Sequence, residues 1–301
     1  MTIPLVTHPA YSFAFPGRHR FPMEKFGLLN DYLSEQGILT PNNTFRPGPA
    51  SKAVLYGAHC PEYIERFCRN EQSASEVRRM GLPWSEGLRK RTLISPNGTL
   101  LTAHLALSYG IACHLAGGTH HAHYDFASGF CIINDLAVTA RTLLAQGKVK
   151  KLLIFDCDVH QGDGTAAILA DEPRAITCSI HCEKNFPARK AISDIDVALP
   201  PGTTDNDYLE AVEKTLAEVI NQEQPELVLY DAGVDIYRED PLGLLKVSEA
   251  GIAERDHLVL SICQARNIPT ATVIGGGYDD DRKALAKRHA LVVKQAHQLW
   301  A

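Results

Sequence analysis

The chain has 301 residues, of which 45% are hydrophobic and 22% charged, and its formal net charge at pH 7 is −5. This length suits one large hydrophobic core, and no stretch is basic enough to bind nucleic acid directly. No apolar run approaches the ~20 residues of a membrane span, and segment 1–20 lacks the apolar core of a signal peptide, so we expect a cytoplasmic protein without a membrane partner.

Along the chain, a loop signal comes first and is followed by alternating helical and strand-like segments. Residues 40–49 contain three prolines and two asparagines, which predicts a short surface loop. Apolar residues at helical spacing predict a helix over 98–115. Further helices are predicted at 136–146, 207–221 and 248–266, and buried strands at 151–155, 175–180, 226–230 and 270–274. Continuous apolar strands between amphipathic helices are typical of a parallel sheet covered on both faces, so we predict one α/β domain over 1–301.

The eight cysteines are scattered along the chain and form no Cys-x-x-Cys pair. In a cytoplasmic chain of this size, such cysteines are most simply reduced and buried. Cys178 and Cys182 could form one half of a metal site, but no second pair exists to complete it.

The segment that follows the strand at 151–155 carries two carboxylates and an imidazole. Because side chains alternate along a strand, Asp156, Asp158 and His160 are expected to share one face. This set suits a metal ion, and two close carboxylates repel each other unless a cation or a proton lies between them. A polar strand end that makes turns and caps is the alternative interpretation.

Two later strand ends add candidate residues. Asp231 and Asp235 follow the strand at 226–230, and either could be the third protein ligand that a catalytic zinc ion requires. The glycines at 275–277 allow a sharp turn beside a ligand, and Tyr278 could donate a hydrogen bond to an oxyanion. A flexible turn with a packed aromatic ring is the alternative.

Three histidines, His120, His121 and His123, follow a Gly-Gly pair at 117–118. Adjacent histidines on a strand would face opposite ways, but after a glycine turn both can point into a site. A metal-binding tract and a run of exposed histidines are the alternatives.

Five motifs agree in order and spacing with one known family. They are Gly-Gly-Thr-His-His at 117–121, Gly-Phe-Cys at 129–131, Asp-Cys-Asp-Val-His-Gln-Gly-Asp-Gly at 156–164, Asp235 with Asp240-Pro241, and Gly-Gly-Gly-Tyr at 275–278. This set resembles the histone deacetylase family over roughly residues 19–278. Segments 19–23 and 81–84 resemble the shorter bacterial, class IV-like members.

The resemblance implies the arginase/deacetylase fold, a single α/β domain whose mostly parallel sheet of about eight strands has helices on both faces. It implies one catalytic Zn²⁺ ion, although Fe²⁺ also suits the ligand set, and its ligands would be Asp158, His160 and Asp235. The implied catalytic residues are the histidine pair His120 and His121, their carboxylate partners Asp156 and Asp163, and Tyr278. A structural K⁺ ion is implied at Asp156, Asp158, His160, Ser179 and Ile180. The implied substrate tunnel is lined by Gly129, Phe130, Phe186, Gly276 and Gly277.

The function that follows from the resemblance is that of a metal-dependent deacetylase or deacylase. A metal-activated water would attack the amide, the histidine pair would move the protons, and Tyr278 would polarise the carbonyl. The expected substrate is an acylated amine, either acetyl-lysine in a protein or a small molecule such as an acetylpolyamine. The oligomeric state and the preferred acyl chain stay open.

Two rival functions fit the residues less well. A dimanganese ureohydrolase of the same fold needs an Asp-x-His-x-Asp run, whereas the order at 156–160 is Asp-x-Asp-x-His. A non-catalytic acyl-amine-binding relative would be expected to lack Tyr278 or a metal ligand, and neither is missing. The chain departs from many family members at Gln161, where they have histidine, and at His123-Tyr124 on the rim. The carboxylate that grips a substrate backbone in some eukaryotic members has no clear counterpart.

Overall fold

A computed structural model describes residues 2–17 and 19–300; Met1 and Ala301, the ends of the predicted domain, lie outside the described residues, as does Arg18. Its eight strands form one sheet in the order β2-β1-β3-β8-β7-β4-β5-β6, and every neighbouring pair is parallel. The strands are β1 (Leu5–Val6), β2 (Thr44–Phe45), β3 (Ile111–His114), β4 (Leu152–Asp156), β5 (Ala175–Cys182), β6 (Ile195–Leu199), β7 (Val228–Asp231) and β8 (Thr270–Val273). The predicted α/β fold with about eight mostly parallel strands is confirmed.

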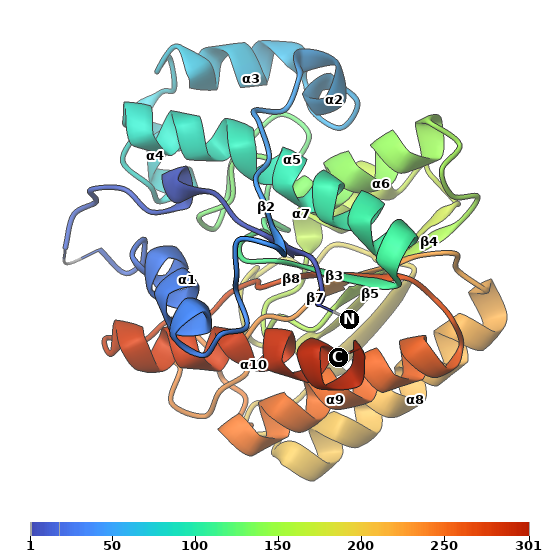
Figure 1. The fold of residues 1–301 in the computed structure, drawn as a ribbon. Helices are drawn as coiled ribbons and strands as arrows, with labels where there is room; N and C mark the ends of the chain where they lie inside the picture. The colour runs from blue at the N-terminus through green and yellow to red at the C-terminus, as the bar shows by residue number, and fades with distance from the viewer. Residues whose placement is uncertain (1, 18, 301) are drawn as a thin grey trace.

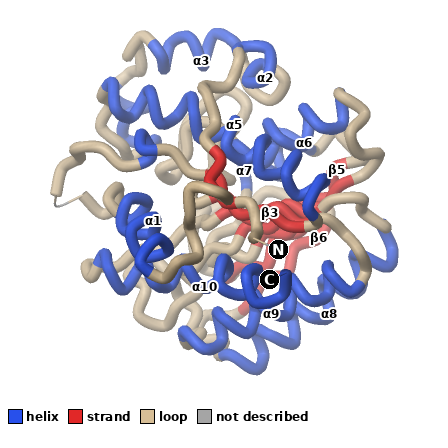
Figure 2. The backbone as a smooth tube through the Cα atoms, viewed as in Figure 1, coloured by secondary structure: helices blue, strands red, loops and turns tan. Residues whose placement is uncertain are grey.

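Helices cover both faces of this sheet (Figure 1). One face carries α1 (Lys25–Glu35), α8 (Asp205–Glu223), α9 (Glu249–Ala265) and α10 (Arg282–Trp300). The other carries α5 (Glu86–Tyr109), α6 (Asp135–Ala145) and α7 (Asp163–Leu169), with α2 (Lys52–Tyr56), α3 (Pro61–Cys68) and α4 (Ala74–Met80) beyond them. A short 3₁₀ helix spans Pro9–Tyr11. The strands therefore lie in a middle layer between two helical layers (Figure 2).

The central strands explain why the sequence shows continuous apolar runs. Every residue of β3, β4, β5, β7 and β8 is buried, because helices cover both sides of each strand. The edge strand β6 instead alternates between half-buried and exposed residues. The four predicted strands correspond to β4, β5, β7 and β8, and the helices predicted at 136–146, 207–221 and 248–266 correspond to α6, α8 and α9.

The helix predicted over 98–115 is wrong at both ends. Helix α5 begins earlier, at Glu86, and stops at Tyr109, and residues 111–114 form the central strand β3. Gly110 separates the two elements: its φ is +83°, and its N–H donates to the carbonyl of Ala106, which ends the helix. The predicted loop at 40–49 contains the two-residue strand β2.

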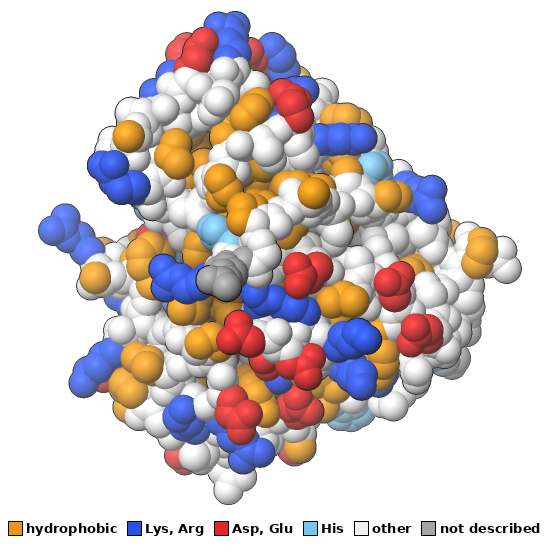
Figure 3. Space-filling model, turned by 90° about the vertical axis from the view of Figure 1, so that its left-hand side faces the viewer, with side chains coloured by type: hydrophobic (Ala, Val, Ile, Leu, Met, Phe, Trp, Pro, Cys, Tyr) orange, Lys and Arg blue, Asp and Glu red, His pale blue; other side chains and the backbone are white. Residues whose placement is uncertain are grey.

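The burial of the cysteines and the distribution of surface charge agree with the expectations drawn from the sequence. The eight cysteines are all free and six of them are buried, Cys178 and Cys182 included. None of the described helices combines the length and apolar character needed to cross a membrane. On the face drawn in Figure 3, basic and acidic side chains are interspersed, in keeping with the small net charge.

Candidate active site

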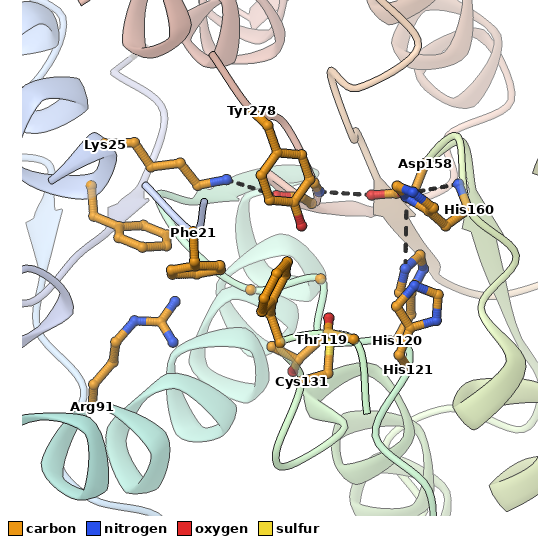
Figure 4. Close-up of a pocket in the computed structure, with 17 residues that line it drawn as sticks. Phe21, Lys25, Arg91, Thr119, His120, His121, Cys131, Asp158, His160 and Tyr278 are labelled. Carbon is orange, nitrogen blue, oxygen red and sulfur yellow. Dashed lines mark hydrogen bonds and ion pairs between the residues drawn. The ribbon is translucent and has the colours of Figure 1, made fainter. Parts of the chain in front are cut away.

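The candidate site lies where the carboxyl ends of the central parallel strands meet. Ligand sites in open α/β sheets form at this edge because the loops that leave neighbouring strands converge there. The loops after β3, β4, β7 and β8 bring together the two histidines, Asp158 with His160, Asp235, and Tyr278. Figure 4 shows His120, His121, Asp158 and His160 on one side of a cavity, with Tyr278 above its centre.

One cluster of ligand atoms consists of Asp158, His160 and Asp235, whose atoms lie within 4.8 Å of one another. His160 Nδ1 is 3.0 Å from Asp158 Oδ1 and 3.1 Å from Asp235 Oδ2, and all three residues are buried. Backbone N–H groups fix both carboxylates: Gly276 donates to Asp158 Oδ2 at 2.7 Å and Val159 donates to Asp235 Oδ1 at 2.9 Å. Burial and the charge of Asp158 raise the pKa of Asp235. Two buried carboxylates and an imidazole at this spacing suit one divalent transition-metal ion.

A second cluster contains His120, Asp156 and Asp231, again within 4.8 Å of one another. Both carboxylate oxygens of Asp231 are buried without a hydrogen-bond partner among the described residues, and burial together with the charge of Asp156 raises its pKa well above the usual range. Asp231 therefore lies in a different cluster from Asp158 and His160, and Asp235 is the aspartate that clusters with these two residues. The expectation that Asp156, Asp158 and His160 share one face does not hold, because β4 ends at Asp156 and the chain then turns.

The adjacent histidines both enter the cavity, each backed by a carboxylate. Nδ1 of His120 is 2.7 Å from Asp156 Oδ2, and Nδ1 of His121 is 2.7 Å from Asp163 Oδ1. The ring centroids are 4.1 Å apart. Burial disfavours a charged His120, but the carboxylates of Asp156 and Asp158 outweigh it and raise its pKa well above the usual value. Burial and the neighbouring His120 lower the pKa of His121 to about 3. The surroundings of His120 thus favour its protonated form, whereas those of His121 favour its neutral form.

The third histidine of the motif, His123, does not line the cavity. Its Nε2 atom is 3.1 Å from Asp163 Oδ2, and its ring stacks on Phe126 with 4.3 Å between centroids. His123 therefore acts as a second partner for the Asp163 carboxylate, and the tract of three histidines is not a metal cluster among the described residues.

Tyr278 is placed by the glycine loop that precedes it. Its backbone N–H donates to Asp240 Oδ2 at 2.7 Å, and only 9% of the residue is exposed. A Cβ atom at Gly276 would collide with the carboxylates of Asp235 and Asp158, so glycine is required at this close approach. Burial raises the pKa of Tyr278 well above its usual value, which keeps the hydroxyl protonated.

The predicted tunnel corresponds to two adjoining cavities. They share His121, Gly129, Phe130, His160 and Tyr278. Phe186 lines the outer cavity of about 330 Å³, and its ring stands perpendicular to that of His121 at 4.8 Å. Gly276 lines the inner cavity. Gly277 lines neither cavity, and its carbonyl instead accepts a hydrogen bond from Lys25.

The residues expected around a K⁺ ion lie on two neighbouring strands and the loop beyond them. Asp156 of β4 pairs in register with Ser179 of β5, and Ile180 is buried beside them. Asp158 and His160 follow in the loop after β4.

Gln161, which stands where many family members have histidine, has a structural role. Its side-chain amide donates to Asp196 at 2.7 Å and to the carbonyl of Ala191.

Sequence reasoning missed two cations at the inner end of the site. Lys25 of α1 and Arg91 of α5 both line the inner cavity and are buried. Lys25 lies two positions beyond the 19–23 motif, but nothing local to Arg91 marks it, because it stands in an ordinary run of basic residues at 89–91.

Comparison with known proteins supports a single family for this chain. A family model described as histone deacetylase domain matches residues 19–295. The chain is 46% identical over 300 residues to an uncharacterized protein of Picosynechococcus sp., covering 100% of both chains. It is 31% identical to histone deacetylase 2 of Arabidopsis thaliana, over 92% of this chain and 74% of the relative. It is 29% identical to the acetoin utilization protein AcuC of Staphylococcus aureus, over 88% of this chain and 74% of the relative.

One solved structure matches the whole fold. The crystal structure of an HDAC homolog complexed with SAHA aligns with a TM-score of 0.83 at 24% sequence identity. The alignment covers 99% of this chain and 85% of the other. At this identity the match establishes the fold.

Proposed function

The chain belongs to the histone deacetylase family and is a deacetylase hydrolase, and from this premise we propose that it uses one divalent metal ion to hydrolyse the amide of an acylated amine such as acetyl-lysine. The observation that carries the proposal is the buried cluster of Asp158, His160 and Asp235 beside a carboxylate-backed histidine pair and Tyr278. We propose that the whole chain, 1–301, acts as one catalytic domain in the cytoplasm.

In this proposal Asp158, His160 and Asp235 hold Zn²⁺ or Fe²⁺. When bound, such an ion supplies Lewis acidity, which polarises the amide carbonyl and lowers the pKa of a water molecule. A structural K⁺ ion beside Asp156 and Ser179 belongs to the same proposal, supported by their adjacent positions on β4 and β5.

The histidine pair moves the protons. His121 is neutral and its Nδ1 atom is engaged by Asp163, so its Nε2 atom can accept the proton of the attacking water. His120 carries a proton, held by Asp156, and lies beside His121, so the pair can protonate the leaving amine. Asp156 and Asp163 are positioning residues that fix the orientation of the two rings.

Tyr278 stabilises the charge that develops on the substrate carbonyl. Its hydroxyl stays protonated in its buried position and can donate a hydrogen bond to the carbonyl oxygen as the oxyanion forms. Phe130 lies next to it, with 6.0 Å between ring centroids, and narrows the passage that the acylated side chain would occupy.

The rim favours a neutral or acidic substrate over a polycation. Three exposed arginines, Arg20, Arg78 and Arg79, line the outer cavity. An acetylpolyamine would bring positive charge against these guanidinium groups, whereas an acyl-lysine in a neutral or acidic peptide would not. We therefore propose a peptide-borne or otherwise non-cationic acylated amine as the substrate, in preference to an acetylpolyamine.

The test is hydrolysis of a fluorogenic acetyl-lysine peptide by the metal-loaded protein, with acetylputrescine as the competitor and SAHA, which an HDAC homolog binds, as the inhibitor. We expect SAHA-sensitive turnover of the peptide, faster than turnover of acetylputrescine, with one metal ion per chain. Faster acetylputrescine turnover would overturn the substrate assignment, and two manganese ions per chain would indicate ureohydrolase-like chemistry instead.

A further inference from the structure

Two buried cations lie at the inner end of the cavity without an ion-pair partner among the described residues. Lys25 is 2% exposed and Arg91 is 5% exposed, and both line the inner cavity. Within residues 2–17 and 19–300, neither side chain forms an ion pair. Lys25 Nζ donates to two backbone carbonyls, those of Gly275 at 3.3 Å and Gly277 at 3.4 Å. Nε of Arg91 is buried without a hydrogen-bond partner.

The two cations face the reacting end of the site. Figure 4 shows the ammonium of Lys25 and the guanidinium of Arg91 pointing into the cavity from the side opposite His120, His121 and Asp158. Tyr278 lies between the two ends, with Lys25 Nζ 5.9 Å from its ring centroid. An acyl group whose carbonyl meets Tyr278 would therefore extend its far end toward the two cations.

Aromatic rings hold Arg91 in place and keep water away from it. Its guanidinium carbon lies 4.5 Å from the ring centroid of Phe26 and 5.6 Å from that of Phe21. Lys25 Nζ is 5.5 Å from the same Phe26 ring. Such contacts stabilise a cation but satisfy none of its N–H donors.

Burying unpaired cations is costly unless an anion completes the site. Burial lowers the pKa of Lys25 to about 8 and that of Arg91 to about 10, so both side chains carry charge at neutral pH. A carboxylate placed between them would accept hydrogen bonds from both, and Arg91 offers the planar pair of donors that binds carboxylates in a bidentate manner.

The space in front of the cations is short. The whole inner cavity, from Asp158 and His160 to the two cations, has a volume of about 40 Å³, which suits a short tail and is too small for a long fatty chain. Resting on the proposed deacylase function, we propose that the acyl group removed by this enzyme ends in a carboxylate, as a succinyl group does, and that Lys25 and Arg91 bind that carboxylate. Phe21 and Phe130 pack against each other with 5.7 Å between their ring centroids, and they would form one apolar wall along the methylene groups.

The reaction remains an ordinary amide hydrolysis. The bond between the acyl carbon and the lysine nitrogen breaks, and a bond from that carbon to the water oxygen forms. One proton of the water passes to the leaving amine through the histidine pair. The products are succinate and the free lysine side chain, and no oxidant or other co-reactant is needed.

The first measurement compares three peptides that differ only in the acyl group on lysine: acetyl, succinyl and succinamoyl. The succinamoyl group has the size of succinyl but carries a neutral amide in place of the carboxylate. We expect the wild-type, metal-loaded enzyme to have kcat/KM at least about tenfold higher for succinyl than for succinamoyl, because charge-assisted hydrogen bonds are lost with the carboxylate. Equal or faster hydrolysis of the succinamoyl peptide would overturn the proposal while leaving the deacylase function intact.

The second measurement removes the positive charge of Arg91. Arg91→Gln should abolish the preference for succinyl while slowing acetyl-lysine hydrolysis much less, and Arg91→Lys should restore part of the preference. Arg89→Gln is the matched control, because Arg89 stands on the same helix but is only partly buried, lies outside the cavity and pairs with Glu86. Arg89→Gln should keep the wild-type ranking, and circular dichroism melting checks that each variant folds.

Equilibrium binding separates failure of this proposal from failure of the proposed function. Titration of the metal-loaded protein with succinate, succinamate and acetate should show that succinate binds tightest and that Arg91→Gln removes the difference. This result would support the carboxylate site even if no peptide were hydrolysed, in which case the deacylase function would be the part that failed. Equal affinity for succinate and acetate would overturn the proposal, because the two cations would then bind any small carboxylate without selecting a carboxylate-ended acyl group.

Discussion

One oxygen of the Asp163 carboxylate, Oδ1, lies 2.7 Å from Nδ1 of His121, and this contact leaves Nε2 of the ring free to face the cavity. The other oxygen is 3.1 Å from Nε2 of His123. Burial disfavours ionisation of Asp163, but the hydrogen bonds from His121 and His123 outweigh it, so its pKa lies below the usual range. One anionic carboxylate thus orients the ring that we propose as the general base.

The role of this contact can be tested with Asp163→Asn. The amide keeps the size of the carboxylate but removes its charge, so His121 should lose basicity and orientation, and kcat should fall by about 10- to 100-fold with little change in KM. His123→Ala is the comparison, and we expect it to have a much smaller effect. If His123→Ala lowers kcat as far as Asp163→Asn does, the carboxylate acts through His123 and not through His121.

Tyr278→Phe removes one hydroxyl and should mainly affect turnover. Since the hydroxyl would bind the oxyanion more tightly than the ground-state carbonyl, kcat should fall by about 100-fold or more while metal content and KM stay near wild type. Tyr109→Phe, at an exposed position at the end of α5, should leave the kinetics unchanged. Unaltered turnover in Tyr278→Phe would remove this residue from the mechanism.

A matched pair of substitutions tests which aspartate binds the metal. Asp235→Asn takes a carboxylate out of the cluster with Asp158 and His160 and should abolish metal retention after gel filtration. Asp231→Asn should retain the metal, because burial already favours the neutral form of Asp231 and the amide has the same shape. Mass spectrometry of the metal content decides which aspartate is the ligand. Loss of metal from Asp231→Asn alone would make Asp231, and not Asp235, the metal ligand.

The buried pair of Arg255 and Asp256 gives a prediction for stability. Arg255 is fully buried, and its guanidinium donates to the carbonyls of Gly233 and Ala232, in the loop that carries Asp235. Arg255→Met removes the cation that pairs with Asp256 and the donor to three carbonyls, those of Gly233, Ala232 and Cys157, so the free energy of unfolding should fall by about 3–5 kcal/mol. Urea denaturation measures this. Arg174→Met, which breaks an exposed pair with Glu172, should change stability little, and an equal loss there would contradict the argument.

Much of the fold could be predicted because its causes are local. A strand covered on both faces must be apolar throughout, so β4, β5, β7 and β8 stand out in the sequence, as do the amphipathic helices between them. Strand β3 was hidden because its four buried residues follow α5 directly and continue the apolar pattern of that helix. Only the backbone conformation of Gly110 separates the two elements.

The sequence by itself determined the fold class, the family and the set of chemical groups, because apolar runs and short motifs depend on residues that are neighbours along the chain. Tertiary structure alone decided how those groups are combined. It joins Asp235 to Asp158 and His160, places Asp231 with Asp156, and brings Lys25 and Arg91 to one cavity from helices on opposite faces of the sheet. These combinations depend on the order of the strands and on where their loops converge, and no local pattern encodes that order.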